Sequence, residues 1–320
     1  MNPFVQASNN NLDYFLTTAI HLDMQDKNQD SLLHYAIRGG AKKIINYLLA
    51  NHINPNLKNN RGETAIFEAV KKGNFEATLK IINYYGNVLV RNIYNETPLH
   101  HAVLKGDLKI IKLLIESGSD VLALNDNGES LLFYAIRSGD VNVFKKINQL
   151  SAMLNKKDNK NNTLLHLACK AGGFQMVEYL LSTNENPHYK NNYEETPIFE
   201  VVRMNNLNLL ELMLKKGSYL DGRNKYQETL FSIAEENDNL MMLEKLKFFQ
   251  NSLLVKQNIQ KNPLRYAVIN KDYEKLTQYL KQGIEDKKDE FHLTSYDYAN
   301  LEKNKKYLKA IANKYYDNRN

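Results

Sequence analysis

Residues 97–129 read TPLHHAVLKGDLKIIKLLIESGSDVLALNDNGE, and the pattern of this stretch returns along most of the chain. The position of Thr97 holds Ser, Thr or Asn in every copy. These copies begin at intervals of 33 residues, at positions 31, 64, 97, 130, 163, 196, 229 and 262. A strict period of this length indicates stacked units, each of which buries its apolar face against the next. Chains built in this way usually present a long surface and rarely enclose a catalytic pocket.

Each unit has the features of two short helices joined by a turn. The leading Thr or Ser suits a helix N-cap, and the proline that follows it at residues 98, 197 and 263 suits the first helical turn. Glycines at residues 73, 106, 139 and 172 fall where the first helix has to end. Ile110, Ile111 and Leu114 then form an apolar stripe at helical spacing. Clusters of Asn, Asp and Gly before the next unit predict a turn.

The third unit, residues 97–129, resembles the ankyrin repeat at nearly every signature position. It has Thr-Pro-Leu-His-x-Ala, a glycine turn at Gly106, an apolar second helix and a return loop rich in Asp, Asn and Gly. Many consecutive units in phase make the match specific. The resemblance implies an all-α ankyrin-repeat solenoid of helix-turn-helix units with hairpin-like return loops. We therefore expect capping helices in residues 1–30, eight repeats in residues 31–293 and a C-terminal capping repeat in residues 294–320.

The seventh unit, which begins at Thr229, departs most from the pattern. It lacks both the proline and the histidine, and Glu235-Glu236-Asn237-Asp238 replaces the basic, glycine-containing turn of other units. The stability of a repeat array is roughly a sum of unit and interface contributions, so a poor interface opens locally. We expect the stack to be weaker or bent at this point.

Composition limits the class of protein. The apolar share of 43% is that of a folded chain, no run of 18 apolar residues exists, and the first residues lack the features of a signal peptide. We expect a monomeric, cytoplasmic protein without a membrane span; a bacterial effector exported without a cleaved signal is the alternative role. The single cysteine, Cys169, occupies a small apolar position, which predicts a buried and inert thiol.

Histidine and phenylalanine alternate at the fourth position of successive units. The first, third and fifth units carry His34, His100 and His166, and the second, fourth and sixth units carry Phe67, Phe133 and Phe199. The resemblance implies a structural histidine that hydrogen-bonds to the leading Thr and to a neighbouring loop. Histidines two units apart are too distant to share a zinc ion, because packed helices lie of order 10 Å apart and zinc–ligand bonds are about 2 Å. We expect neither a metal nor a cofactor.

The resemblance also implies that partners meet a concave face, formed by the return-loop tips and the exposed end of each first helix. The position seven residues after the leading residue belongs to this face and is mostly basic. The predicted partner-binding residues are Arg38, Lys71, Lys72, Lys105, Arg137, Lys170 and Arg203 on the helices, with Arg61, Tyr94, Tyr193 and Tyr226 at the loop tips. Tyrosine and arginine are enriched at binding hot spots. We call the helix positions 38, 71, 137, 170 and 203 the basic ladder.

An acidic column offers a different interpretation of the basic ladder. A glutamate stands directly before the leading residue at Glu63, Glu96, Glu129, Glu195 and Glu228. Local pairs between the two columns would neutralise the ladder, and surface pairs of this kind contribute about 0 to 1 kcal/mol each. If the ladder instead binds a partner, that partner carries an acidic segment, whose attraction steers association.

Three function classes follow from these observations. The leading hypothesis is a non-enzymatic protein-interaction scaffold that binds an unidentified protein. Binding of nucleic acid or an anionic surface is an alternative, although the net charge of +6 is only mildly basic and the chain has no recognised nucleic-acid module. An enzyme is the third: the catalytic motifs G-x-S-x-G, H-E-x-x-H, the P-loop and C-x-x-C are missing, and an unusual site would have to lie in residues 235–290.

Overall fold

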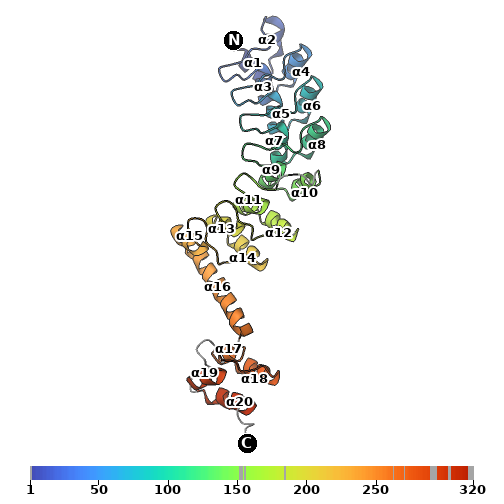
Figure 1. Ribbon diagram of the computed structural model, residues 1–320. Coiled ribbons are helices and arrows are strands. Elements are labelled where there is room, and N and C mark those ends of the chain that lie inside the picture. Colours follow the sequence, from blue (N-terminus) through green and yellow to red (C-terminus); the bar gives the residue numbers. More distant parts are fainter. Residues whose placement is uncertain are drawn as a thin grey trace. The chain divides into compact units, whose positions relative to one another are not determined.

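The computed structural model describes residues 2–150, 154, 156–183, 185–261, 263–269, 271–288, 294–301 and 304–315 (Figure 1). The chain divides into an N-terminal region, Met1–Asn237, and a C-terminal region, Asp238–Asn320. The described residues form α-helices and no strand, so the all-α prediction is confirmed. In this part of the chain, no helix combines the length and the apolar character needed to cross a membrane.

Helix pairs build the N-terminal region. The first helices of the pairs are α3 (Leu32–Arg38), α5 (Ala65–Lys72), α7 (Pro98–Lys105), α9 (Leu131–Ser138), α11 (Leu164–Ala171), α13 (Pro197–Arg203) and α15 (Leu230–Glu236). The second helices are α4 (Lys42–Ala50), α6 (Phe75–Asn83), α8 (Leu108–Glu116), α10 (Val141–Asn148), α12 (Phe174–Ser182) and α14 (Leu207–Lys215). Figure 1 shows the return loops stacked on one side of the first helices and the second helices on the other.

The predicted apolar stripes form the core between neighbouring pairs. Leu99, Ala102 and Val103 of α7 are fully buried, and so are Ile110 and Leu114 of α8. Helix α7 packs against α5 on one side and α9 on the other. Each first helix therefore depends on both neighbours to cover its apolar surface, as a repeat array requires.

The helix ends follow the local sequence signals. Thr97 lies in extended conformation at the N-cap of α7, and Pro98 occupies the first helical turn. Gly106 ends α7 with a φ of 76°, in the left-handed region that glycine adopts without strain. The predicted N-cap and glycine stop are confirmed in this unit.

Two histidines at equivalent positions, His34 and His166, link one unit to the next. His34 Nδ1 accepts a hydrogen bond from the backbone N–H of Ser31 at 3.1 Å, and His34 Nε2 donates to the Glu63 carbonyl at 3.1 Å. His166 makes the same contacts with Thr163 and Glu195, at 3.1 and 2.9 Å. Burial lowers the pKa of His34 and of His166, which keeps both rings neutral. The structural interpretation is confirmed for His34 and His166. His100 shares the contact with its leading residue Thr97, at 3.1 Å, but its buried Nε2 makes no such loop hydrogen bond in the part of the chain that the structure describes.

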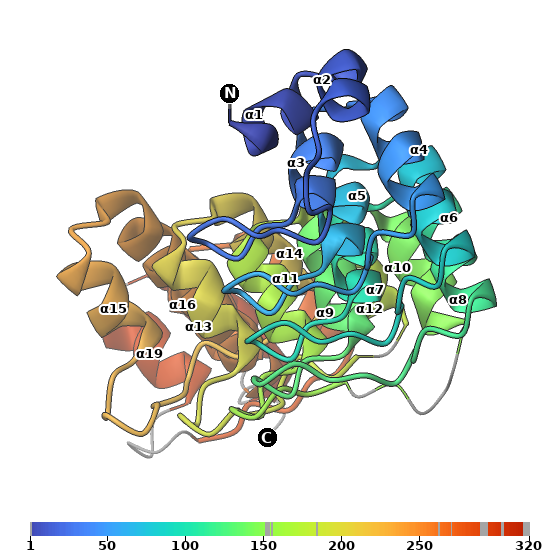
Figure 2. The same ribbon diagram turned by 90° about the horizontal axis from the view of Figure 1, so that it is seen from above.

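A ladder of backbone hydrogen bonds holds the return loops in register. The N–H of each loop tip donates to the tip carbonyl of the loop before it, at distances of 2.8–3.1 Å, from residues 60, 93, 126, 159, 192 and 225 to residues 28, 61, 94, 127, 160 and 193. Figure 2 shows that successive loops of the N-terminal region turn gradually from one unit to the next, from the blue loops to the yellow ones. The loops are therefore part of the stacked structure.

The first residues form two short helices, α1 (Pro3–Ser8) and α2 (Leu12–Thr17). Helix α1 packs against α3, and Phe15 of α2 is buried. The Asn10 side chain accepts a hydrogen bond from the backbone N–H of Lys43 at 3.0 Å, which ties this segment to the start of α4. These contacts cover the outer face of the first unit, as a cap does.

The seventh unit differs from the expected pattern of two helices and a return loop. Helix α16 (Leu240–Lys261) runs through the positions at which a return loop was expected. No glycine or proline occurs in this stretch, so nothing in the sequence ends the helix before Pro263, which opens the next one. The predicted start of the eighth unit, Asn262, lies outside the described residues.

The C-terminal region has a core of its own. Its further helices are α17 (Pro263–Ile269), α18 (Tyr273–Lys281), α19 (Ser295–Leu301) and α20 (Lys305–Tyr315). Leu264, Leu276, Ala299 and Ile311 are buried together in one cluster. The predicted boundaries of the caps and of the eight repeats remain predictions.

Candidate partner-binding surface

The exposed ends of the first helices and the return-loop tips adjoin one another, and we call this surface the inner face. A hollow of about 310 Å³ shows the adjacency, because its lining includes the loop residues Asn127 and Lys160 as well as Arg137 of α9 and Lys170 of α11. In these units, side chains from loops and helices thus form one surface.

Four members of the basic ladder form ion pairs with carboxylates of the chain. Lys71 donates to Glu63 at 2.6 Å. Arg137 donates through both terminal nitrogens to Glu129, and Arg203 does the same to Glu195. The remaining pairs join Arg38 to Asp30 at 3.1 Å and to Glu68 at 2.8 Å. These pairs match the interpretation that the acidic column neutralises the ladder.

The electrostatics of Glu195 illustrate these pairs. Burial opposes ionisation of this carboxyl, but hydrogen bonds from Arg203 and Asn224 outweigh it and lower the Glu195 pKa. The hydrogen bond to Glu195 likewise raises the pKa of Arg203. Both groups are therefore charged and mutually compensated, and neither presents a free charge to a partner.

The other predicted residues are more open to solvent. Lys72, Lys105 and Lys170 are exposed, and the described residues place no carboxylate oxygen within 4.0 Å of their ammonium groups. Tyr94 is 59% exposed, and Tyr226 is 64% exposed. These side chains can meet a partner without first breaking an ion pair.

Two predicted loop residues have neighbours of their own. Arg61 pairs with Glu63 at 3.4 Å and remains more than half exposed. Tyr193 stacks on Tyr226, with ring centroids 6.4 Å apart and an angle of 29° between the rings. The structure thus brings the two tyrosines of adjacent loops together, while Tyr94 belongs to a loop of an earlier unit.

A polar network in the third and fourth units was not predicted. The Tyr134 hydroxyl donates to Glu96 at 2.5 Å and accepts from Asn125 at 2.8 Å, while His101 Nε2 lies 3.0 Å from Glu96. Burial opposes ionisation of Glu96, but the hydrogen bonds from His101, Tyr134 and Asn92 together lower its pKa to about 2. The available signal was a polar or aromatic residue four positions after the leading residue in most units, here His101 and Tyr134.

Glu200 on α13 also stands four residues after its leading residue, Thr196, and was also missed. It lines both the hollow of about 310 Å³ and a second one of about 250 Å³, which share Lys160, Asn162, Lys170 and Glu200. Burial raises the pKa of Glu200, although the positive charges of Lys170 and Arg203 oppose that effect. Together the two hollows form a polar depression on the inner face of the fourth to sixth units.

Other chemical groups in the chain are the single cysteine and the acidic and histidine side chains. Cys169 is fully buried, and its Sγ lies 3.9 Å from Met213 Sδ. Burial raises the pKa of the Cys169 thiol. The predicted burial of this residue is confirmed, and its inert character remains a prediction. Within the described ranges, no group of three or more His, Cys, Asp or Glu side chains is placed to hold a metal ion.

Comparison with known families agrees with the repeat pattern. A family model described as ankyrin repeats (3 copies) matches residues 4–92 and 132–224, and one described as ankyrin repeats (many copies) matches residues 99–147. A search of curated proteins found no match. Ankyrin repeats are generally protein–protein interaction modules, and their proteins are typically not enzymes. On its sequence pattern, its helix pairs and these matches, the chain belongs to the ankyrin repeat family.

Proposed function

We propose that this protein is a non-enzymatic scaffold that binds a partner protein along the inner face of its N-terminal region. The observation that carries the proposal is the continuity of this face. Backbone hydrogen bonds of 2.8–3.1 Å between successive loop tips hold the exposed side chains of neighbouring units in one register. A surface that is already ordered loses little conformational entropy on binding, which favours affinity.

The side chains available on this face support a macromolecular partner. Lys72, Lys105, Tyr94 and Tyr226 are exposed, and tyrosine supplies a large contact area at low entropic cost. The paired members of the basic ladder are less available to a partner, because their charges are already compensated within the chain. We therefore assign the main partner contacts to the unpaired lysines and the tyrosines.

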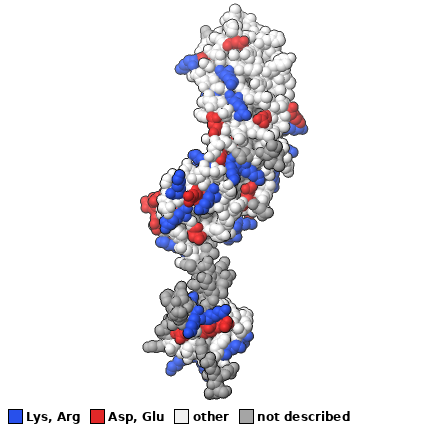
Figure 3. All heavy atoms as spheres, in the orientation of Figure 1, with Lys and Arg blue, Asp and Glu red and all other residues white. Residues whose placement is uncertain are grey.

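Binding of nucleic acid receives less support from the same surface. In the view of Figure 3, basic and acidic side chains lie interspersed over the N-terminal region. Phosphate binding favours a stripe of uncompensated positive charge, because the affinity comes from releasing counterions. We further propose a monomer in a reducing, cytoplasm-like compartment, in keeping with the single buried thiol of Cys169.

Partner capture from a lysate of the source organism tests the proposal. The inner-face variant replaces Lys72 and Lys105 with Glu and Tyr226 with Ala. The control variant replaces Lys109 and Lys146 with Glu, since these exposed residues lie on the second helices α8 and α10. Circular dichroism first establishes that all three chains are equally helical.

The proposal predicts a protein that is captured by the wild type and the control and lost by the inner-face variant. Equal capture by all three chains, or loss with the control variant alone, contradicts binding along the inner face. Such a result would move the binding surface to the second helices or to the C-terminal region.

A further inference from the structure

The ion pairs of the inner face follow one rule, and the fifth unit breaks it. In the second, fourth and sixth units, the carboxylate directly before the leading residue pairs with the cation seven residues after it, as Glu63 does with Lys71 at 2.6 Å. The fifth unit has Asn162 and Lys170 at these two positions. Among the described residues, no carboxylate oxygen lies within 4.0 Å of the Lys170 ammonium group.

An exchange of two side chains explains the exception. The second unit has the amide Asn59 in its loop and the carboxylate Glu63 four residues later, whereas the fifth unit has Asp158 and Asn162 at these positions. Asp158 accepts hydrogen bonds from the backbone N–H groups of Lys160 and Asn162, at 2.9 and 2.8 Å. The carboxylate of the fifth unit thus organises its own loop, and the position that would pair with the ladder cation holds an amide.

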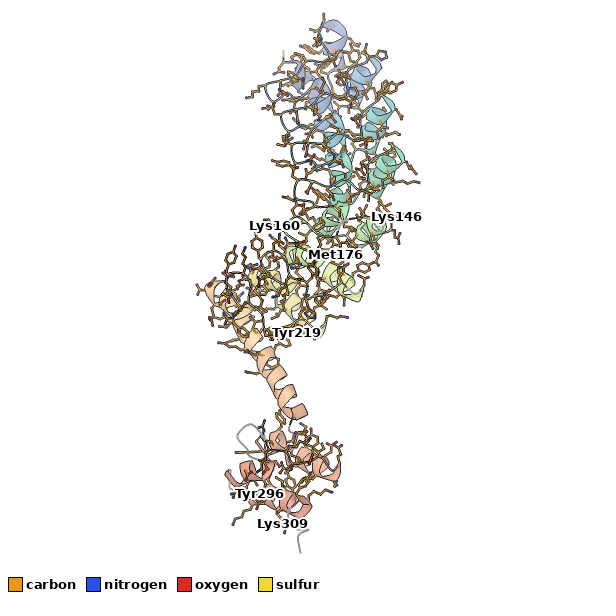
Figure 4. The ribbon with its side chains drawn as sticks, viewed as in Figure 1. Lys146, Lys160, Met176, Tyr219, Tyr296 and Lys309 are labelled. Atoms are coloured by element: carbon orange, nitrogen blue, oxygen red, sulfur yellow. The ribbon has the colours of Figure 1, made fainter. Side chains whose placement is uncertain are left out.

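Asn162, which stands where the other units have the pairing carboxylate, lines the polar depression of the fourth to sixth units. Its hollows of about 310 and 250 Å³ share Lys160 and Lys170, and each is large enough for one or two side chains. Lys160 has no carboxylate partner within the described residues either. In Figure 4, Lys160 lies on the side of the return loops near α11, and Lys146 lies on the side of the second helices.

The walls of the depression differ in polarity. Leu167 lines the larger hollow and stands where neighbouring units carry a tyrosine, histidine or glutamate. The stacked pair of Tyr193 and Tyr226 lines the smaller one. These apolar surfaces can cover a side chain that neighbours a bound charge.

We propose that the fifth unit binds a carboxylate from an acidic segment of the partner protein, which completes with Lys170 the ion pair that Glu63 forms with Lys71. Lys160 provides a second cation, and an aromatic or aliphatic neighbour of the bound acid contacts Leu167 and the stacked tyrosines. Charge complementarity of this kind contributes specificity and a faster association. The inference rests on the proposed function and assigns carboxylate binding to one part of the inner face.

Glu200 supplies a test of the sign of the bound charge. It lines both hollows, and the described residues give its carboxylate no ion pair within 4.0 Å. A negatively charged ligand is repelled by this group, whereas a positively charged ligand is attracted to it. The variant Glu200→Gln therefore strengthens binding of an acidic segment and weakens binding of a basic one.

The central experiment exchanges the two side chains without changing the net charge. The variant Asp158→Asn with Asn162→Glu copies the pattern of the second unit and supplies Lys170 with an internal carboxylate. Because neighbouring units already fold with this pattern, the variant should keep its structure, which circular dichroism checks. The probe is a fluorescent peptide of glutamate and tyrosine, titrated with full-length protein, and a peptide of lysine and tyrosine is its basic counterpart.

We expect the exchange to weaken binding of the acidic peptide by about tenfold or more. A second variant, Lys160→Gln with Lys170→Gln, removes the two cations and should weaken binding of the acidic peptide to a similar extent. The control Lys146→Glu, on α10, should leave this affinity unchanged. The proposal is overturned if the wild type does not bind the acidic peptide, if neither variant weakens it, or if Glu200→Gln weakens it. Partner capture separates the two claims: a captured protein that requires Lys72 and Lys105 but tolerates the exchange would leave the proposed function intact.

Discussion

Replacement of His100 by Phe should make the N-terminal region less sensitive to acid. Burial lowers the pKa of His100 to about 4, below the ordinary value of 6.5. As pH falls below 6.5, the unfolded chain takes up a proton at this histidine before the folded chain does, so the free energy of unfolding decreases. Between the two pKa values this single side chain removes about 3 kcal/mol of stability, and below pH 4 it removes no more.

Phenylalanine fits this position, because Phe67, Phe133 and Phe199 are buried at the equivalent place in the neighbouring units. The variant loses the hydrogen bond that His100 Nδ1 accepts from the Thr97 N–H, which changes its stability by an amount that is the same at pH values where His100 is neutral. The informative quantity is therefore the difference between two pH values within each protein. The carboxylates are the same in both proteins, so their contribution to the pH dependence cancels from the comparison.

Urea unfolding followed by far-ultraviolet circular dichroism, at about pH 7 and about pH 4.5, measures this difference. The wild type should lose more stability on acidification than His100→Phe does, by roughly 2 to 3 kcal/mol. The variant His21→Gln, at an exposed position, should behave like the wild type. Equal losses in the wild type and in His100→Phe would refute the argument that burial keeps this histidine neutral.

The remaining predictions concern three other side chains. Tyr134→Phe should cost about 1 to 2 kcal/mol of unfolding free energy, because Glu96 and Asn125 each lose a hydrogen-bond partner. The pKa of Glu96, measured by nuclear magnetic resonance, should rise in this variant, and an unchanged pKa would contradict the assigned hydrogen bond. Cys169 should not react with a thiol reagent until the chain is unfolded in urea, and reaction in the native protein would show that the thiol is accessible. Arg137→Ala should cost about 1 to 3 kcal/mol in thermal or urea unfolding, because the Glu129 side chain is only 8% exposed and would lose its cation, while the partly exposed guanidinium keeps the cost below that of a fully buried pair. A cost below about 0.5 kcal/mol would show that solvent screens the pair.

Most of the fold was predictable because its signals are local and repeated. The cap at Thr97, the stop at Gly106 and the apolar spacing of Ile110 and Leu114 each have a direct structural cause, and repetition makes their combination specific. Helix α16 was not predictable from the period alone. The repeat pattern indicates a loop there, whereas the lack of glycine and proline between residues 240 and 262 favours continuation of the helix.

The candidate site was only partly predictable, since its properties depend on distances between side chains. The sequence placed Lys71 and Glu63 in two columns eight residues apart and left open whether they pair. In the structure the two long side chains meet, with Lys71 Nζ 2.6 Å from the Glu63 carboxylate. The role of Asp158 was hidden for the same reason, because only the loop hydrogen bonds show that its carboxylate is used within the loop.

Hydroxyl-radical footprinting of the protein with its captured partner tests the central claim most directly. Tyr94 and Tyr226 on the inner face are 59% and 64% exposed, and Tyr85, which follows the second helix α6, is 90% exposed. The account predicts that the partner protects Tyr226 or Tyr94 from oxidation and leaves Tyr85 as reactive as in the free protein. Protection of Tyr85 with both inner-face tyrosines unchanged would contradict binding along the inner face.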